Sequence, residues 1–360
     1  MSPSQRPAPV GSTSCSPSSG AALPSAPVGP APDPVTGARF LPAALTRPTP
    51  ADHKYTRGVL TLATGSDAYP GAALLGTEAA ARCGIGMVRY DGPDAVARLV
   101  IARTPEVVPR PGRSQAWVLG SGWEAGQADA SRVHERVRAI LARASDDAAG
   151  AFLVLDAGAL LAVPNLADEC APFTTVLTPH AGEAAALAAR LVGGIPAGPA
   201  GDGSSAGKAW TRARIEAHPE AAARDLAERS GAIVVLKGHT TVVASPGGAP
   251  LTVTAPTTRL ATAGTGDVLA GMIGALLALN HGALCHTALY REGPTGSGGP
   301  ASDAPASDAV ARTVAAAVEL HGLCAREAAG AGEAPILAHD LARVAPRVIA
   351  RVQAEAQAKD

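Results

Sequence analysis

Aromatic residues are scarce in this chain of 360 residues, because Phe, Tyr and Trp together make up only 3% of it. Since 47% of the residues are nevertheless hydrophobic, Ala, Val and Leu must fill the core. The length allows one large domain or two small ones. The net charge is only −1 and no block of Lys or Arg occurs, so we expect no nucleic-acid partner.

Cysteine is sparse and irregularly placed. The five cysteines are odd in number, lie far apart and form no Cys-x-x-Cys pair; they are Cys15, Cys83, Cys170, Cys285 and Cys324. This pattern is typical of reduced cytosolic thiols and not of a disulfide framework or a zinc site. We therefore expect a cytoplasmic protein.

No stretch is apolar for long enough to predict a membrane span. The best candidate is the run Val268–Leu279, which is followed by Asn280 and His281. A span needs about 20 apolar residues, so a buried helix is favoured. Residues 1–50 also lack the basic start and apolar centre of a secretory signal. We expect no membrane partner.

Three segments are rich in Pro, Ser or Gly and poor in large apolar residues. Residues 1–50 are expected to form a disordered tail, and residues 192–207 and 291–308 to be flexible insertions within a single domain over residues 51–355.

Within that domain, short apolar runs alternate with helical patterns. The expected strands are Gly58–Thr64, Ala116–Gly120, Phe152–Asp156, Thr175–Leu177 and Ile233–Leu236, and the expected helices are Ala72–Cys83, Asp129–Ala144, Glu183–Leu191, Ala221–Arg229 and Val268–Leu279. This order predicts an α/β fold with a mostly parallel sheet covered on both faces. Ligands of such folds bind beyond the carboxyl ends of the strands.

The strongest motif is Gly264-Thr265-Gly266-Asp267, directly before the apolar helix. Glycines allow backbone N–H groups to approach an anion, and a helix start offers unpaired N–H groups and a positive dipole end. A phosphate would suit this site. Asp267 is a candidate to orient or deprotonate a substrate hydroxyl, although Asp and Thr are also ordinary helix-capping residues.

Two further motifs follow strands. In LKGHTT, Lys237 and Gly238 can meet a nucleotide phosphate, but on local sequence alone an ordinary hairpin turn is favoured. In TPHAGE, His180 can donate a hydrogen bond to a ligand, although a lone His is more often structural. Weaker turns containing Tyr69-Pro70-Gly71-Ala72, Gly120-Ser121-Gly122 and Asp156-Ala157-Gly158 also follow strands.

Taken in order, these motifs resemble the ADP-dependent NAD(P)H-hydrate dehydratases of the ribokinase-like superfamily. The resemblance runs from about His53 to Arg351 and includes HKYTRGVL, YPGAA, LGSG, LDAGAL, TPHAGE, VVLKGHTT, LATAGTGDVLAG and VELHGLCA. It implies a three-layer α/β/α fold. It also implies the ADP-dependent, Mg²⁺-assisted dehydration of the S-form of NADHX or NADPHX to NADH or NADPH, with release of AMP and phosphate.

The resemblance further implies the roles of individual residues. The nucleotide-binding positions map onto Lys237, Gly238, His239, Thr240, Thr241 and Gly266, and the hydrate-binding positions map onto Ala72, Gly122, His180 and Asp267, with Asp267 catalytic. No metal-binding residues are assigned. A homo-oligomer, as in tetrameric family members, is expected, together with a separate NAD(P)H-hydrate epimerase.

The chain departs from the family pattern at three positions. Ser121 and Ala181 stand where the family commonly has Pro, and Gly158 stands where it has a second Asp. Two alternatives remain open. One is a ribokinase-like kinase of the hydroxymethylpyrimidine or hydroxyethylthiazole type, whose phosphorylated product would persist. The other is a nucleotide-binding protein that has lost catalysis.

Overall fold

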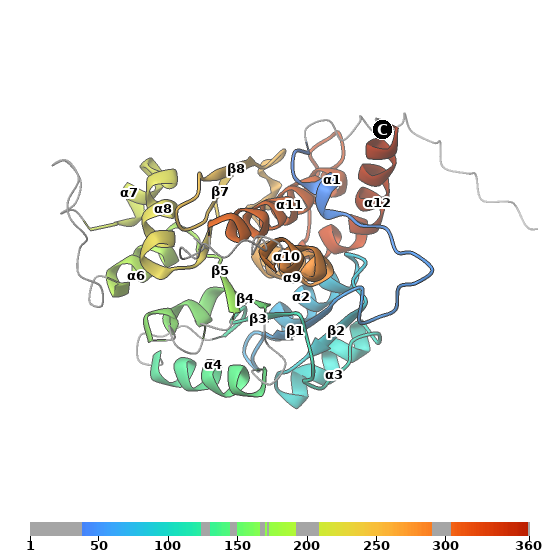
Figure 1. Cartoon of the computed structure of the whole chain (residues 1–360), viewed down its shortest axis with the longest axis horizontal. Coiled ribbons are helices and arrows are strands. Elements are labelled where there is room, and N and C mark those ends of the chain that lie inside the picture. Colours follow the sequence, from blue (N-terminus) through green and yellow to red (C-terminus); the bar gives the residue numbers. More distant parts are fainter. Residues whose placement is uncertain are drawn as a thin grey trace, which may run out of the picture. The chain divides into compact units, whose positions relative to one another are not determined.

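The computed structural model describes residues 38–123, 130–144, 150–165, 170, 173–191, 209–289 and 304–358. Their centre is one eight-stranded sheet with the order β2-β1-β3-β4-β5-β6-β7-β8 (Figure 1). Its strands are β1 (Val59–Ala63), β2 (Met87–Tyr90), β3 (Ala116–Leu119), β4 (Ala151–Leu155), β5 (Phe173–Leu177), β6 (Ile233–Leu236), β7 (Thr240–Ala244) and β8 (Leu251–Thr254).

Strands β1 to β6 pair in parallel, whereas β6–β7 and β7–β8 pair antiparallel. The carboxyl ends of β1, β3, β4, β5 and β6 therefore lie along one edge of the sheet. The residues that leave this edge include Gly65, Gly120, Asp156, Thr178 and Lys237. Side chains from distant parts of the sequence are brought together at this edge.

One face of the sheet is covered by α2 (Pro70–Ala81), α9 (Thr265–Leu279), α11 (Ala304–Ala329) and α12 (Ala338–Gln357), with α10 (His281–Leu289) beside them (Figure 1). α9 packs directly on β1, β3 and β4 and is buried along nearly its whole length. A Cβ on Gly274 would lie 2.5 Å from Cγ2 of Val118, so only glycine permits this close approach.

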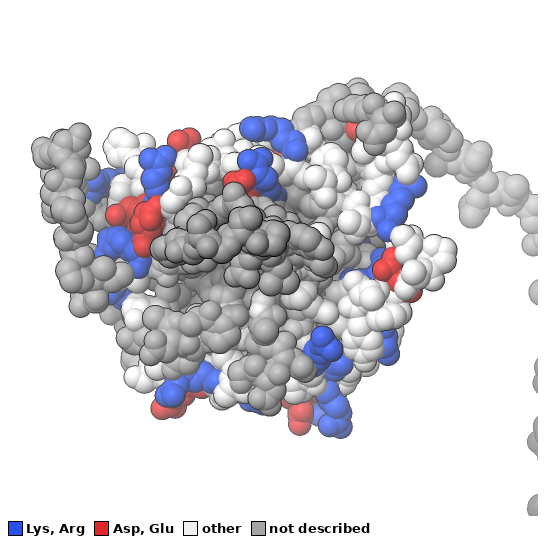
Figure 2. All heavy atoms as spheres, in the orientation of Figure 1, with Lys and Arg blue, Asp and Glu red and all other residues white. Residues whose placement is uncertain are grey.

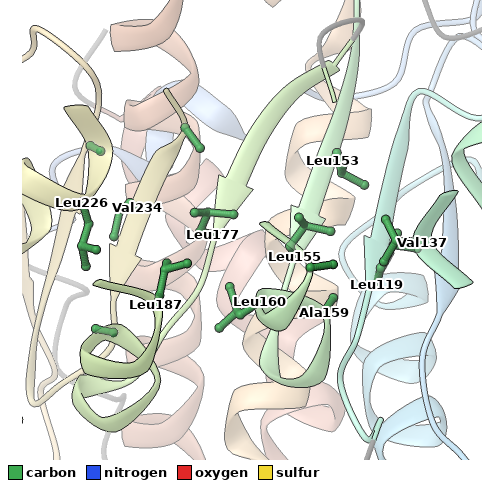
Figure 3. Close-up of a cluster of buried hydrophobic side chains, with 14 of the residues drawn as sticks. Leu119, Val137, Leu153, Leu155, Ala159, Leu160, Leu177, Leu187, Leu226 and Val234 are labelled. Carbon is green, nitrogen blue, oxygen red and sulfur yellow. The ribbon is translucent and has the colours of Figure 1, made fainter. Parts of the chain in front are cut away.

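The opposite face is covered by α4 (Ala130–Ala144), α6 (Ala181–Leu191) and α8 (Pro219–Ser230). Figure 3 shows Leu119, Leu155 and Leu177 of neighbouring strands packed against side chains of these helices, including Val137, Leu187 and Leu226. Because alternate strand residues face opposite sides and both sides are buried, the strands read as continuous apolar runs.

The remaining described elements are α3 (Asp94–Arg103), α7 (Arg212–Ala217) and three short 3₁₀ helices at Ala157–Leu161, Val163–Asn165 and Thr258–Leu260. On the face seen in Figure 2, described Lys and Arg side chains are interspersed with Asp and Glu and form no continuous basic area. None of the described helices is both long and apolar enough to cross a membrane.

The predicted α/β/α fold is confirmed, and all ten predicted elements are present with shifts at their ends. The predicted tail over residues 1–50, however, ends too late in the sequence. The helix α1 (Leu41–Ala44) lies inside it, and Leu41 is fully buried. Glu319 of α11 accepts hydrogen bonds from the N–H groups of Arg39, Phe40 and Leu41 over 2.8–2.9 Å, which satisfies the amides at the start of α1.

The two predicted insertions fall largely outside the described residues. The structure does not describe residues 192–207 and 291–303, which belong to the predicted insertions. It also does not describe residues 1–37 of the predicted tail. Residues 304–308, which were predicted as part of the second insertion, instead begin α11. Their Ala-rich sequence continues the helical pattern that follows.

Candidate functional site

A buried carboxylate lies at the carboxyl end of β4. Asp156 is 2% exposed, and both of its oxygens accept hydrogen bonds. Ser121 Oγ donates to Oδ2 over 2.7 Å, while Thr178 Oγ1 and Lys237 Nζ donate to Oδ1 over 2.7 and 2.8 Å. Loops after four strands, β3 to β6, therefore converge on one network.

Lys237 also lies 3.7 Å from Oε2 of Glu183 at the start of α6. Burial alone would lower the pKa of Lys237, but the charges of Asp156 and Glu183 and the hydrogen bond to Asp156 raise it above its ordinary value. Burial alone would raise the pKa of Asp156, but Lys237, Thr178 and Ser121 hold it below its ordinary value. Both groups are therefore charged at neutral pH.

The pKa of a second carboxyl group, that of Asp267, is shifted in the opposite direction from the pKa of Asp156. It lies in the first turn of α9, directly after the turn at Gly264, which has a φ of 86°. Burial and the nearby charge of Asp156 raise the pKa of Asp267 to about 6, against the opposing charge of Lys237. A carboxyl group with this pKa is suited to accept a proton near neutral pH.

The start of α9 lies close to the Lys237 ammonium. A Cβ added to Gly266 would lie 3.9 Å from Nζ of Lys237. The site thus combines a cation, a glycine-containing helix start and a carboxyl group that can exchange a proton. A phosphate at a helix start next to an ammonium is a favourable arrangement.

A pocket opens beside this point. Its polar lining includes Lys237, Gly238, Thr241, Thr265, Gly266 and His321. Its apolar lining comes from β8, α9 and α11 and includes Val253, Leu269 and Val318. A cavity lined by apolar side chains together with a few polar groups is typical of a small-molecule site.

The structure separates the residues of the LKGHTT motif. Lys237, Gly238 and Thr241 line the pocket together with Gly266, as the assignment to one ligand requires. His239 and Thr240 are exposed and are not among the residues that line it. Thr240 Oγ1 lies 3.0 Å from Oγ1 of Thr254, across the β7–β8 pair. The hairpin alternative for this motif and the nucleotide alternative are therefore both consistent with the geometry.

His180 serves as a helix cap in the structure. Its Nδ1 accepts hydrogen bonds from the N–H groups of Gly182 and Glu183 over 3.0 and 3.2 Å, at the start of α6. Its side chain is 59% exposed. The N–H of Lys237 donates to the carbonyl of Pro179 over 2.8 Å, which keeps the two motifs adjacent. Because Nδ1 is used as an acceptor, Nε2 is the donor of the ring, and it lies 3.5 Å from Oε1 of Glu183.

Ala72 and Gly122 also meet. Gly122 has a φ of 69°, and a Cβ there would lie 2.5 Å from Cβ of Ala72. Tyr69, which precedes α2, is 58% exposed beside this contact, and its carbonyl oxygen would be 2.9 Å from the same Cβ. Only a glycine permits the loop after β3 to pass this close to α2, so the two expected hydrate positions lie side by side.

Three further features were not assigned from the residues themselves. His321 lines the pocket from α11, and its only sequence signal is its place in the VELHGLCA motif. Asp156 was noted as a strand end and as the Asp that the LDAGAL motif retains, but its hydrogen bond with Lys237 was not predicted. Gly158 packs against Trp123, because a Cβ there would lie 2.8 Å from Cβ of Trp123.

The described residues contain no group of three or more His, Cys, Asp or Glu side chains that could hold a metal ion. Asp156, the most buried carboxylate of the site, already accepts three hydrogen bonds.

Comparison with known proteins identifies the family to which this chain belongs. Residues 60–347 match the family model for NAD(P)H-hydrate dehydratase. A bifunctional NAD(P)H-hydrate repair enzyme from Mycobacterium tuberculosis is 42% identical over 236 residues, which cover 64% of this chain and 43% of that protein. The chain thus spans less than half the length of this relative.

A shorter relative is named ADP-dependent (S)-NAD(P)H-hydrate dehydratase. This protein from Neisseria meningitidis serogroup B is 36% identical over 240 residues, which cover 63% of this chain and 71% of the relative. Among solved structures, the ADP/ATP-dependent NAD(P)H-hydrate dehydratase of Bacillus subtilis, co-crystallised with ATP and Mg²⁺, is similar with a TM-score of 0.61 and 25% identity. The alignment covers 87% of this chain and 96% of that one.

Proposed function

The chain belongs to the NAD(P)H-hydrate dehydratase family, and on that premise we propose that it dehydrates the S-form of NADHX and NADPHX at the expense of ADP. The observation that carries this proposal is the position of Asp267 at the glycine-containing start of α9, close to Lys237. A proton acceptor and a phosphate-binding helix start are the two parts that phosphorylation of a hydroxyl requires.

In the proposed reaction, Asp267 accepts the proton of the ring hydroxyl as the hydroxyl oxygen attacks the terminal phosphorus of ADP. The bond from that phosphorus to the bridging oxygen breaks, and AMP leaves. The ring nitrogen lone pair then expels the new phosphate as its carbon–oxygen bond breaks. Loss of a proton from the neighbouring carbon restores the double bond, so the products are NADH, AMP and phosphate.

Two groups of residues would hold the substrates. We assign the nucleotide to the pocket lined by Lys237, Gly238, Thr241 and Gly266, with its phosphates at the start of α9. We assign the hydrated ring to the side formed by Ala72, Gly122, His180 and Asp267, where Nε2 of the exposed His180 ring would exchange its Glu183 partner for the ligand. His239 and Thr240 would then support the hairpin that carries Thr241.

Magnesium would enter with the nucleotide. Mg²⁺ usually keeps several waters and is held largely by substrate phosphates. A cytoplasmic location, a homo-oligomer and a separate epimerase that supplies the S-form stay predictions. The epimerase prediction gains support from the bifunctional repair enzymes among the relatives.

The decisive experiment combines the protein with NADHX, Mg²⁺ and ADP and follows nicotinamide absorbance and free phosphate in the same reaction. We expect one AMP and one phosphate for each NADH regenerated. The Asp267→Asn variant should lose about 100- to 10,000-fold in turnover, which is the usual contribution of a general base. A lasting phosphorylated product, or no recovery of absorbance with ADP or ATP, would support the kinase alternative.

A further inference from the structure

His321 connects α11 to the helix start that carries Asp267. The ring is 6% exposed, and its Nε2 lies 2.9 Å from the carbonyl oxygen of Thr265, the first residue of α9. It also lines the pocket together with Lys237 and Gly266. The proposed function gives this residue no role.

The protonation of the ring follows from its partner. A carbonyl oxygen only accepts hydrogen bonds, so Nε2 must carry the proton and donate it. Burial lowers the pKa of His321 to about 4; the Thr265 carbonyl opposes this shift, and the positive charge of Lys237 adds to it. The ring is therefore a neutral donor in the Nε2–H form at neutral pH.

The Thr265 carbonyl belongs to the same planar peptide unit as the N–H of Gly266. In a trans peptide the C=O and N–H bonds point in nearly opposite directions. Holding the carbonyl oxygen therefore also sets the direction of the Gly266 N–H, which is one of the unpaired donors at the start of α9. A hydrogen bond to the carbonyl further polarises the amide and strengthens its N–H as a donor.

Other contacts keep both ends of this connection in place. The Thr265 hydroxyl donates to the carbonyls of Leu260 and Thr262, both over 2.9 Å. On the α11 side, a Cβ at Gly322 would lie 2.9 Å from Cδ of Pro256, so the helix is seated closely on the loop after β8. The His321 ring thus reaches α9 from a fixed backbone.

We propose that His321 is a positioning residue, whose Nε2–H holds the Thr265–Gly266 peptide so that the Gly266 N–H is directed at the phosphate transferred in the reaction. The identity of that phosphate rests on the proposed function. The hydrogen bond itself does not, so the two can be tested separately.

The first test compares His321→Gln with His321→Leu. The side-chain amide nitrogen of Gln can take the place of Nε2 as a donor, whereas Leu keeps the apolar volume and removes the donor. We expect the Leu variant to lose about 10- to 100-fold in kcat, as a misdirected group in an active site does, with the KM for the hydrate nearly unchanged. The Gln variant should recover most of this loss.

A merely structural role would lower the melting temperature of His321→Leu without changing kcat per folded molecule, and that result would overturn the proposal. The second test needs no activity. Imidazole ¹⁵N NMR of the wild-type chain should show the Nε2–H form of His321 throughout pH 5–9. The Gly266 amide resonance should shift on adding ADP, and shift less in His321→Leu where that variant folds.

The two tests separate the possible failures. An inactive wild type with the expected NMR signals would count against the dehydratase function and leave the His321 hydrogen bond intact. A His321 ring that titrates near the ordinary value of about 6.5, or that carries its proton on Nδ1, would overturn the positioning role whatever the enzyme does.

Discussion

The ammonium of Lys237 lies 2.8 Å from Oδ1 of Asp156, which is nearly completely buried at the end of β4. This pair links the pocket proposed for the nucleotide to the core of the sheet, because Lys237 also lines that pocket. Asp156 therefore holds the Lys237 ammonium in place. Ser121, which stands where the family commonly has Pro, adds a hydrogen bond to Asp156 that a proline cannot donate.

Replacing Lys237 by Ala should raise the KM for ADP and also destabilise the fold. Charge-assisted contacts to a phosphate contribute roughly 1.5–3 kcal/mol. The variant leaves Asp156 buried and unpaired, which costs about 3–5 kcal/mol. Steady-state kinetics and urea unfolding at pH 7.5 measure the two effects.

The matched control is the double variant Lys237→Ala/Asp156→Asn. Asn carries no charge, and its amide oxygen can accept from one of the hydroxyls of Ser121 and Thr178 while its NH₂ group donates to the oxygen of the other. We expect it to regain most of the lost stability without regaining ADP affinity. If the KM for the hydrate rose alone, Lys237 would belong to the hydrate side of the site.

The raised pKa of Asp267 predicts the pH dependence of turnover. A base must be deprotonated to accept a proton, so kcat should rise with pH up to a pKa of about 6 and then become flat. Asp156→Asn removes a negative charge that raises the pKa of Asp267, so the midpoint should move to lower pH. A kcat profile that is flat from pH 5 to 7, or a midpoint that moves upward, would contradict this assignment.

The same carboxyl group predicts a pH-dependent effect of Asp267→Asn on stability. Burial first, and then Asp156, raise the pKa of Asp267 from 3.8 to about 6 in the folded chain, so its contribution to stability is present below pH 4 and is lost as the pH rises through 6. Asn does not ionise. After discounting for partial exposure, the variant should be more stable than wild type by roughly 2 kcal/mol at pH 8. At pH 4 the two should unfold alike in urea, and a constant difference at both pH values would show that ionisation is not the cause.

Two truncations should distinguish the contribution of residues 1–37 to stability from the contribution of α1. Removing residues 1–37 should leave the melting temperature unchanged, since their Pro/Ser-rich composition does not favour a packed core. Removing residues 1–45 takes away the buried Phe40 and Leu41 and the partners of Glu319, which should cost about 3–6 kcal/mol. Equal melting temperatures for both truncations would show that α1 contributes little.

The alternation of apolar runs was sufficient to predict the sheet and its site-bearing edge, because parallel strands buried on both faces have a simple sequence pattern. β2 was not predicted, since Met87–Tyr90 is short and includes Arg89. α1 was hidden within a Pro-rich segment, because its stability comes from Glu319, which is 278 residues away from Leu41 in the sequence.

The turn from Gly264 to Asp267 could be predicted from the sequence because it is local. The contacts that join distant elements of the candidate site could not. The partners of Asp156 come from three other loops, and His321 meets Thr265 across 56 residues. The sequence also did not predict that His180 caps the start of α6 with its Nδ1.

Gly158 offers a last prediction, because it stands where the family commonly has a second Asp. A Cβ at this position would lie 2.8 Å from Cβ and 3.0 Å from the carbonyl oxygen of Trp123. Trp123 is itself 5% exposed, with the Arg136 guanidinium 3.9 Å from its ring centre, so it has little room to move. Gly158→Ala and Gly158→Asp should therefore both destabilise the fold by about 1–3 kcal/mol, as overpacking does, and Asp should not increase kcat.

Gly71→Ala is the matched control, since a Cβ there meets nothing within 4 Å in the first turn of α2. Thermal unfolding of the three variants tests the prediction, and an unchanged melting temperature for Gly158→Asp would show that the loop after β4 can accept the family residue.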